Sequence, residues 1–169
     1  MKFERIDDAL KQQGAMFLNK RHLLCTRRVL QAIAAYDESL SFVQSLIEPI
    51  RRLVLECGMN ETQAFHRFIA QIEHLKIDNY LCTCGVCPDY LAIEFDCRHV
   101  PNATRKRQLT RMLQAYSTFN EQIGYQPGMI ALAETCLKLC NGDEERAFIA
   151  FTIFVQERHL QLENALVQV

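Results

Sequence analysis

The stretch 113–151, LQAYSTFNEQIGYQPGMIALAETCLKLCNGDEERAFIAF, holds the clearest structural signals in the chain. Apolar residues recur along it at spacings of three and four, which is typical of helices that bury one face. Two turn-forming interruptions separate the helical runs: IGYQPG at 123–128 and NGDEE at 141–145. Asn-Gly closes a helix well, and acidic residues favour the first turn of the next helix. The stretch therefore predicts three helices joined by short turns.

The same helical spacing extends over most of the 169 residues. Gly (6) and Pro (4) are scarce, and no alternating strand pattern of convincing length is present. Pro49 is expected to kink or end the helix that starts near Leu40, because proline removes a backbone donor. The predicted fold class is all-α with many helices. The windows that predict helices most strongly are 23–57, 61–77, 104–119, 128–139 and 143–167.

One segment, 81–101, is the least helical part of the chain and contains the cysteine-rich sequence CTCGVCPDY. It divides the chain into a helical half at 1–80 and a second helical half at 102–169. A chain with 49% hydrophobic and 23% charged residues has the composition of a globular protein, and its length suits one core. We therefore expect a single domain over 1–169, with 81–101 as an irregular connector.

The two halves resemble each other in sequence. Residues 28–72 align without a gap on residues 111–155, with 11 identities. An internal duplication explains this match, and so does the apolar spacing that any two amphipathic helix pairs share. The sequence leaves both explanations open. The identities include Gln31/Gln114, Cys57/Cys140, Glu61/Glu144, Ala64/Ala147 and Phe68/Phe151.

Charge and hydropathy exclude several classes of protein. The formal net charge is only −1, and the one basic cluster, at 104–111, fits the exposed start of a helix, so we expect no nucleic-acid partner. No apolar run is long enough for a transmembrane span, and the acidic N-terminus does not resemble a signal peptide. We therefore expect a cytoplasmic protein whose eight cysteines are core thiols or metal ligands, because disulfides are rare in reducing compartments.

Ordered motifs in the opening stretch resemble the central block of the TBC domain family. They are Ala-Tyr at 115–116, Ile-Gly-Tyr at 123–125, Gly-Met at 128–129 and the Glu-Glu and Ala-Phe pairs within 144–148. TBC domains are helical GTPase-activating modules that act on Rab-type small GTPases. The resemblance implies an all-α TBC-like fold and a Rab-type GTPase, or a related membrane-trafficking protein, as the partner.

The family's activity depends on two side chains. An arginine from an I-x-x-D-x-x-R segment enters the GTPase site, and a glutamine from Y-x-Q-G-M orients the attacking water. A guanidinium and an amide placed in this way stabilise the charge of phosphoryl transfer and accelerate it by roughly 10³- to 10⁵-fold.

Both motifs are out of register in this chain. In IEFDCRHVP, His99 stands three residues after Asp96, and Arg98 stands one residue too early. In GYQPGM, Pro127 takes the glutamine position, and Gln126 precedes it. A shift by one residue turns a helical side chain by about 100°.

Three functional hypotheses follow from this displacement. The first is a module that docks a GTPase without efficient activation. The second is an active GTPase activator that uses Arg98 and Gln126 as catalytic residues through a local bulge. The third is a structural or interaction protein, clipped by zinc. The residues expected to dock the GTPase are Asp96, His99, Tyr125, Gly128 and Met129.

The zinc hypothesis rests on the cysteines of the connector. Cys82, Cys84 and Cys87 lie close together in the sequence, and Cys97 or His99 follows as a candidate fourth ligand of a tetrahedral structural site. The alternative is that these cysteines alternate between core and solvent on an extended segment. Apart from zinc, no cofactor is expected.

The resemblance also implies helices that this chain does not supply. TBC domains have a Trp-containing entry helix and further helices after the Ala-Phe element, whereas Trp is absent here and the sequence stops at Val169. We expect the remaining apolar surface to find a partner, because exposed apolar faces mark interaction sites. A second copy of the chain and another subunit remain open alternatives.

Overall fold

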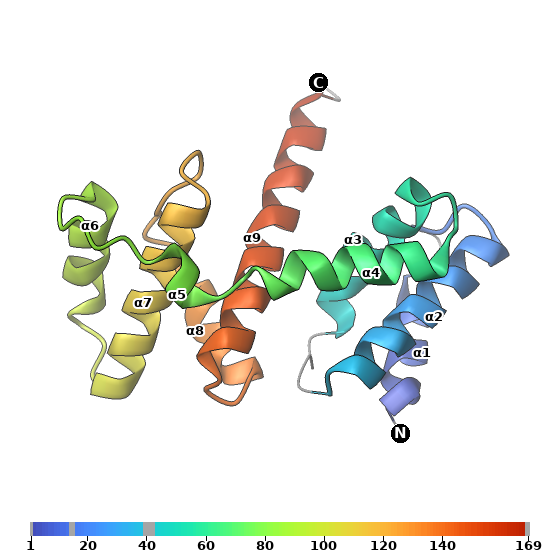
Figure 1. Ribbon diagram of the computed structural model, residues 1–169, viewed down its shortest axis with the longest axis horizontal. Helices are drawn as coiled ribbons and strands as arrows, with labels where there is room; N and C mark the ends of the chain where they lie inside the picture. Colours follow the sequence, from blue (N-terminus) through green and yellow to red (C-terminus); the bar gives the residue numbers. More distant parts are fainter. Residues whose placement is uncertain (1, 14–15, 39–42, 168–169) are drawn as a thin grey trace. The chain divides into compact units, whose positions relative to one another are not determined.

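Helices are the only regular elements in the residues that the computed structural model describes, which are 2–13, 16–38 and 43–167 (Figure 1). This confirms the predicted all-α class. The contacts group the chain into two compact units. Unit 1 comprises Met1–Glu73 with Ile153–Val169, and unit 2 comprises His74–Thr152. The last helix, α9 (Glu144–Val167), supplies its first part to unit 2 and the remainder to unit 1.

Unit 1 is built around α2. This helix, Lys20–Tyr36, packs against α1 (Lys2–Gln12), α3 (Val43–Glu56) and α4 (Glu61–Glu73). Each helix buries one apolar stripe, as the spacing of three and four requires. The core residues of unit 1 include Ile6, Val29, Ile33, Ile47, Ile50, Val54 and Phe68.

Unit 2 is built around α7. This helix, Ala103–Phe119, packs against α5 (Ile77–Tyr80), α6 (Pro88–Cys97) and α8 (Met129–Leu139). Residues 112–117 of α7 are all buried, so this turn and a half of helix lies inside the unit. The ring of Tyr116 meets that of Phe151 edge to face, with centroids 5.1 Å apart, a favourable arrangement for two aromatic quadrupoles.

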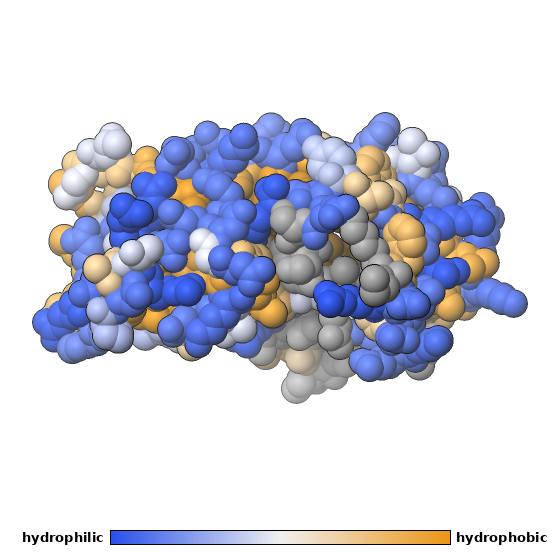
Figure 2. Space-filling view, turned by 90° about the horizontal axis from the view of Figure 1, so that it is seen from below, coloured by the Kyte–Doolittle hydropathy of each residue, from blue (hydrophilic) through white to orange (hydrophobic). Residues whose placement is uncertain are grey.

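On the face drawn in Figure 2, hydrophilic residues cover most of the area and hydrophobic residues come through in separate patches. None of the helices in the described ranges has the length and apolar composition needed to cross a bilayer.

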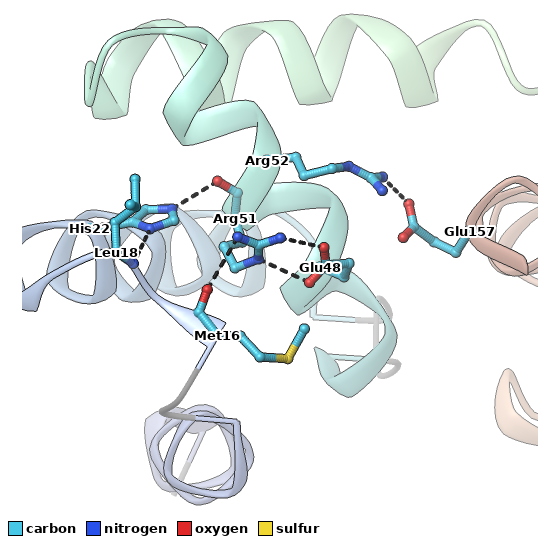
Figure 3. Close-up of polar contacts among 7 residues, drawn as sticks. All are labelled: Met16, Leu18, His22, Glu48, Arg51, Arg52 and Glu157. Carbon is cyan, nitrogen blue, oxygen red and sulfur yellow. Dashed lines mark hydrogen bonds and ion pairs between the residues drawn. The ribbon is translucent and has the colours of Figure 1, made fainter. Parts of the chain in front are cut away.

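A polar network inside unit 1 fixes the chain ahead of α2 to α3 (Figure 3). His22 is fully buried, its Nδ1 accepts from the Leu18 N–H at 3.2 Å, and its Nε2 lies 2.9 Å from the Arg51 carbonyl oxygen. Since Nδ1 is the acceptor, Nε2 carries the proton and donates to Arg51. Both ring nitrogens are satisfied, and His22 is a structural residue.

The Arg51 side chain extends this network. Its Nε and Nη2 donate to the two carboxylate oxygens of Glu48 at 2.9 and 2.6 Å, and its Nη1 donates to the Met16 carbonyl oxygen at 3.2 Å. The hydrogen bonds from Arg51 lower the pKa of the Glu48 carboxyl below its ordinary value. Nearby on α3, Arg52 pairs with Glu157 of α9. These charged groups link three segments of unit 1.

Two features differ from the sequence prediction. The helix α3 does not end at Pro49 but continues through it, because Leu46, Ile50 and Leu53 on the same helix are buried and outweigh one lost hydrogen bond. Its predicted start near Leu40 lies outside the described residues. The predicted irregular connector 81–101 contains α6, which begins at Pro88, a residue favoured in the first turn.

The two units repeat the same local structure 83 residues apart. α2 and α7 are both 17 residues long, and the side chains of Asn19 and Asn102 cap them at equivalent positions. Asn60 and Asp143 likewise cap the starts of α4 and α9, accepting from the backbone three residues ahead.

The turns that close α3 and α8 also correspond. Gly58 and Met59 have φ of 60° and 66°, and their equivalents Asn141 and Gly142 have φ of 54° and 82°. The ion pair Arg28–Glu61, with an N–O distance of 3.0 Å, recurs as Arg111–Glu144 at 3.2 Å. Apolar spacing alone does not produce equivalent caps, left-handed turns and ion pairs. The structure therefore favours a duplication over shared periodicity.

Candidate functional site

The side chain of Tyr125 joins the loop 120–128 to α6 within unit 2. Its hydroxyl donates to Asp96 Oδ2 at 2.7 Å, and its backbone N–H donates to Asp89 Oδ2 at 3.3 Å. Two carboxylates of one helix therefore hold one residue by its side chain and its backbone. We call this arrangement, Asp89, Asp96 and Tyr125, the tyrosine clamp.

Burial and hydrogen bonding keep the Tyr125 hydroxyl protonated. Desolvation raises the pKa of the Tyr125 hydroxyl, and the hydrogen bond to Asp96 raises it further. The phenol is therefore a neutral donor over the physiological range, and Asp96 accepts from it. This is a strong type of hydrogen bond, because the acceptor is ionised.

Gly124 allows the loop to approach α6. Its φ is +60°, and a Cβ at this position would lie 2.8 Å from Asp89 Oδ2. The loop is closed by Asn120, whose carbonyl oxygen accepts from the Gly124 N–H at 2.8 Å and whose side chain accepts from the Ile123 N–H at 3.2 Å. A Cβ at residue 124 would therefore force the Asp89 carboxylate, which accepts from the Tyr125 N–H, to shift.

Arg98 and His99 lie exposed at the end of α6. The Arg98 guanidinium stands 3.7 Å above the ring centroid of Phe95, and its Nε donates to His99 Nε2 at 3.2 Å. Because arginine can only donate, His99 Nε2 is the acceptor in this hydrogen bond. The cation at this corner of the unit is Arg98, stacked on an aromatic ring.

The other predicted residues serve the start of α8. The carbonyl oxygen of Gln126 accepts from the Met129 N–H at 2.9 Å, and Gly128 is the N-cap of α8. Met129 is 8% exposed and belongs to the core of unit 2. The Gln126 and Pro127 side chains face solvent. Among the described contacts, none joins Gln126 to Arg98 or His99.

Three residues that matter here were not among the sequence candidates: Asp89, Leu91 and Phe95. Leu91 and Phe95 are 65% and 57% exposed, one turn apart on α6, and Phe95 carries the Arg98 guanidinium. They form an apolar and cationic surface, which we call the α6 face (Leu91, Phe95, Arg98). Leu91, Ile93, Phe95 and Cys97 are spaced two residues apart, so no helical stripe in the sequence identifies this face.

Cys82, Cys84 and Cys87 form a compact group of thiols. The Sγ atoms of Cys82 and Cys84 are 2.9 Å apart, those of Cys84 and Cys87 are 3.3 Å apart, and all three lie within 4.8 Å of one another. Hydrogen bonding from Cys82 lowers the pKa of Cys84 to about 7, and the hydrogen bond with Cys84 raises the pKa of Cys87 to about 12. This group could hold a metal ion.

Cys97 lies outside this group. It is fully buried on α6, where its thiol lies beside Thr110 of α7 and burial raises its pKa. The structure therefore brings together three of the four predicted metal ligands and places the fourth in the core. Among the described residues, no other cluster of His, Cys, Asp or Glu could hold a metal ion.

Residues 92–164 match the family model of the Rab-GTPase-TBC domain. The match contains Asp96, Arg98 and the loop of Tyr125, and it confirms the resemblance over this part of the chain. It covers less than half of the 169 residues and begins after the three clustered cysteines. No curated protein and no solved structure matches the chain.

Proposed function

We propose that this chain is a TBC-like module that docks a Rab-type small GTPase and does not efficiently stimulate GTP hydrolysis. The observation that carries the proposal is the tyrosine clamp. It holds the segment in the arginine-finger position, 93–99, against the loop in the glutamine position, 123–128. The clamp thus supports a docking role, because it joins the two segments that would face the GTPase. Arg98 and Gln126, the two candidate catalytic residues, each stand one residue before the position that the family motif requires.

The docking surface we assign is the α6 face, which lies directly beside the clamp. Leu91 and Phe95 offer exposed apolar area, and Arg98 adds a cation that is already ordered by stacking. Aromatic residues and arginine are enriched among the residues that dominate protein interfaces. An arginine held on a ring also loses little freedom on binding, which favours affinity.

Weak activation follows from the placement of the same residues. Arg98 would have to leave Phe95 and His99 to enter a nucleotide site, and this costs the stacking energy. Pro127 has no side-chain amide, so it cannot orient a water molecule. Gln126 faces solvent and contributes its backbone carbonyl to the start of α8.

The first test is binding to a panel of Rab-type GTPases loaded with GDP or a GTP analogue. We expect measurable binding to at least one member, weakened about tenfold or more by Leu91→Glu, because a charge would enter the apolar centre of the interface. Leu166→Glu is the matched control, since Leu166 is also a largely exposed leucine (76%, against 65% for Leu91) near the end of α9. Binding to no member would remove the Rab-type GTPase as the partner, and equal loss in both variants would remove the α6 face as the docking surface.

The second test is single-turnover GTP hydrolysis by the GTPase that binds. We expect a rate within about threefold of the intrinsic rate, whereas an inserted arginine with a water-orienting group gives roughly 10³- to 10⁵-fold. Strong stimulation that disappears in Arg98→Ala and Gln126→Ala would instead support the active alternative. Failure to bind any Rab protein, together with binding to another trafficking protein through the α6 face, would change the partner and keep the docking surface.

A further inference from the structure

The thiol group of Cys82, Cys84 and Cys87 lies in the non-helical segment between α5 and α6. The three sulfurs lie within 4.8 Å of one another; Cys84 is exposed, and Cys82 and Cys87 are half-buried. We propose that these three cysteines bind one zinc ion through three thiolates, with the fourth coordination position open at the surface. This site is separate from the tyrosine clamp and does not depend on the proposed function.

The backbone of this segment is shaped to bring the sulfurs together. Gly85 has a φ of +74°, a left-handed conformation that turns the chain between Cys84 and Cys87. The Cys84 N–H points at Cys82 Sγ, with the nitrogen 3.5 Å from the sulfur. Pro88 then starts α6 directly after Cys87 and fixes the direction of the chain. A hydrogen bond from a backbone N–H stabilises a sulfur that carries negative charge.

The distances between the sulfurs fit one shared ion. In a tetrahedral site with Zn–S bonds of about 2.3 Å, neighbouring sulfurs stand roughly 3.8 Å apart. The observed separations of 2.9 and 3.3 Å, with all three atoms within 4.8 Å, need only small side-chain movements to reach that spacing. All three cysteines are free thiols, so each is able to act as a ligand.

The donor set selects a soft or borderline metal. Thiolates suit zinc and copper(I), whereas calcium and magnesium require oxygen ligands. The sequence CGVC has the two-residue spacing of zinc knuckles, and the third thiolate comes from CTC just before it. Cys97 cannot complete the site from its buried position on α6, so a water molecule or an external ligand takes the fourth place.

A bound ion would also stabilise the start of α6. The Cys82 N–H donates to the Tyr90 hydroxyl at 2.8 Å, and this hydroxyl lies 2.8 Å from Thr118 Oγ1 on α7. The neighbouring residue, Asp89, accepts from the Tyr125 N–H. A metal ion would join Cys82, Cys84 and Cys87 and so hold the segment before α6 in one conformation. Metal binding is therefore expected to raise the stability of the part of unit 2 that contains the clamp.

The test is metal content of the full chain after expression with zinc and extensive dialysis. We expect close to one zinc per chain in the wild type and loss of the zinc in Cys84→Ser. Cys25→Ser is the matched control, because Cys25 is remote from the group in sequence and a serine there can still donate to the Met59 carbonyl oxygen. Circular dichroism on each variant checks that the helices are intact, so loss of metal is not confused with unfolding.

Cobalt(II) and thiol reactivity provide a second readout. Cobalt should give thiolate charge-transfer absorption in the wild type and in Cys25→Ser, and this band should be absent in Cys84→Ser. Zinc should slow alkylation of three thiols and leave the buried ones unchanged. The zinc assignment is overturned if the folded wild type retains no zinc, if it binds only copper(I), if Cys25→Ser loses as much metal as Cys84→Ser, or if Cys84 and Cys87 form a stable disulfide under reducing conditions.

Discussion

Tyr125 makes two contacts to α6, one through its side chain and one through its backbone. Its hydroxyl binds Asp96 and its backbone N–H binds Asp89, so the residue links α6 to the loop at two points. The family resemblance identified Asp96 and Tyr125 as candidate site residues, but it did not predict that they are in contact. It could not predict Asp89, because the contact to a backbone N–H 36 residues away leaves no pattern in either segment.

We expect Tyr125→Phe to lower the free energy of unfolding by about 1 to 2 kcal/mol, because it removes a hydrogen bond to a charged acceptor and keeps the ring. Urea denaturation of the full chain measures this change. Tyr36→Phe is the matched control, since the exposed Tyr36 hydroxyl also donates to a carboxylate, Glu73, at 3.3 Å. Equal costs for the two variants would show that the clamp hydrogen bond contributes nothing beyond a surface contact.

The same hydroxyl predicts a dependence on alkaline pH. The pKa of Tyr125 is raised above its ordinary value of 10.0 in the folded chain. Its contribution to stability is therefore fully present below pH 10 and is lost as the pH rises through the folded pKa. The wild type should lose more stability than Tyr125→Phe when denaturation is repeated at rising alkaline pH, and parallel profiles would contradict this.

Gly124 provides a second prediction at the level of one residue. Gly124→Ala should lower the free energy of unfolding by about 1 to 3 kcal/mol, because alanine is strained at positive φ and its Cβ would meet Asp89. Gly128→Ala is the control, since Gly128 has helical φ and ψ of −62° and −15° and nothing within 4 Å of a Cβ. A cost at Gly128 equal to that at Gly124 would mean that the loop is loosely held.

The helix α6 illustrates what periodicity could and could not predict. It buries Ile93 and Cys97 and exposes Leu91 and Phe95, so both its faces carry apolar residues. A helix of this kind gives no amphipathic signal, and the sequence prediction treated its whole region as irregular. The helices of the opening stretch were predictable, because their apolar residues recur at spacings of three and four and both α7 and α8 end at turn-forming residues.

The Glu48–Arg51 pair on α3 predicts how the stability of the fold changes at acid pH. Arg51 lowers the pKa of Glu48 below its ordinary value of 4.5. The ionised pair therefore stabilises the fold above pH 4.5, and this contribution is lost as the pH falls through the folded pKa. Glu48→Gln should cost about 1 kcal/mol at neutral pH, and the difference from the wild type should shrink in acid.

Denaturation at neutral pH and well below pH 4.5 measures the difference for Glu48→Gln. Glu56→Gln serves as the control on the same helix, because the exposed Glu56 carboxylate lies 3.8 Å from Arg67 and forms no bidentate pair. A penalty for Glu48→Gln that stayed constant between neutral and acid pH would rule out the linkage to Arg51.

At the scale of the whole molecule, a duplication accounts for the caps and ion pairs that recur 83 residues apart. Identical residues such as Cys57 and Cys140 were ambiguous, because helix cores share apolar spacing. The equivalent caps at Asn19 and Asn102 and the recurring Arg–Glu pairs are not required by a core, and they became recognisable only when their contacts were known. The repeat also means that a residue in one unit can be compared with the equivalent residue in the other.

The last prediction compares two such equivalent residues, Arg111 and Arg28. Arg111 is 36% exposed and binds both Glu144 and Asp78, which ties α7 to α9 and α5. Its equivalent Arg28 is 65% exposed and, within the described part of the chain, pairs with Glu61. Exposed pairs contribute little because water screens them, and a partly buried arginine with two partners contributes more. Arg111→Ala should therefore cost about 1 kcal/mol and Arg28→Ala close to nothing in urea denaturation. A double-mutant cycle with Glu144→Gln measures the interaction energy of the Arg111–Glu144 pair. A larger loss of stability for Arg28→Ala than for Arg111→Ala would show that the additional partner Asp78 does not increase the contribution of Arg111.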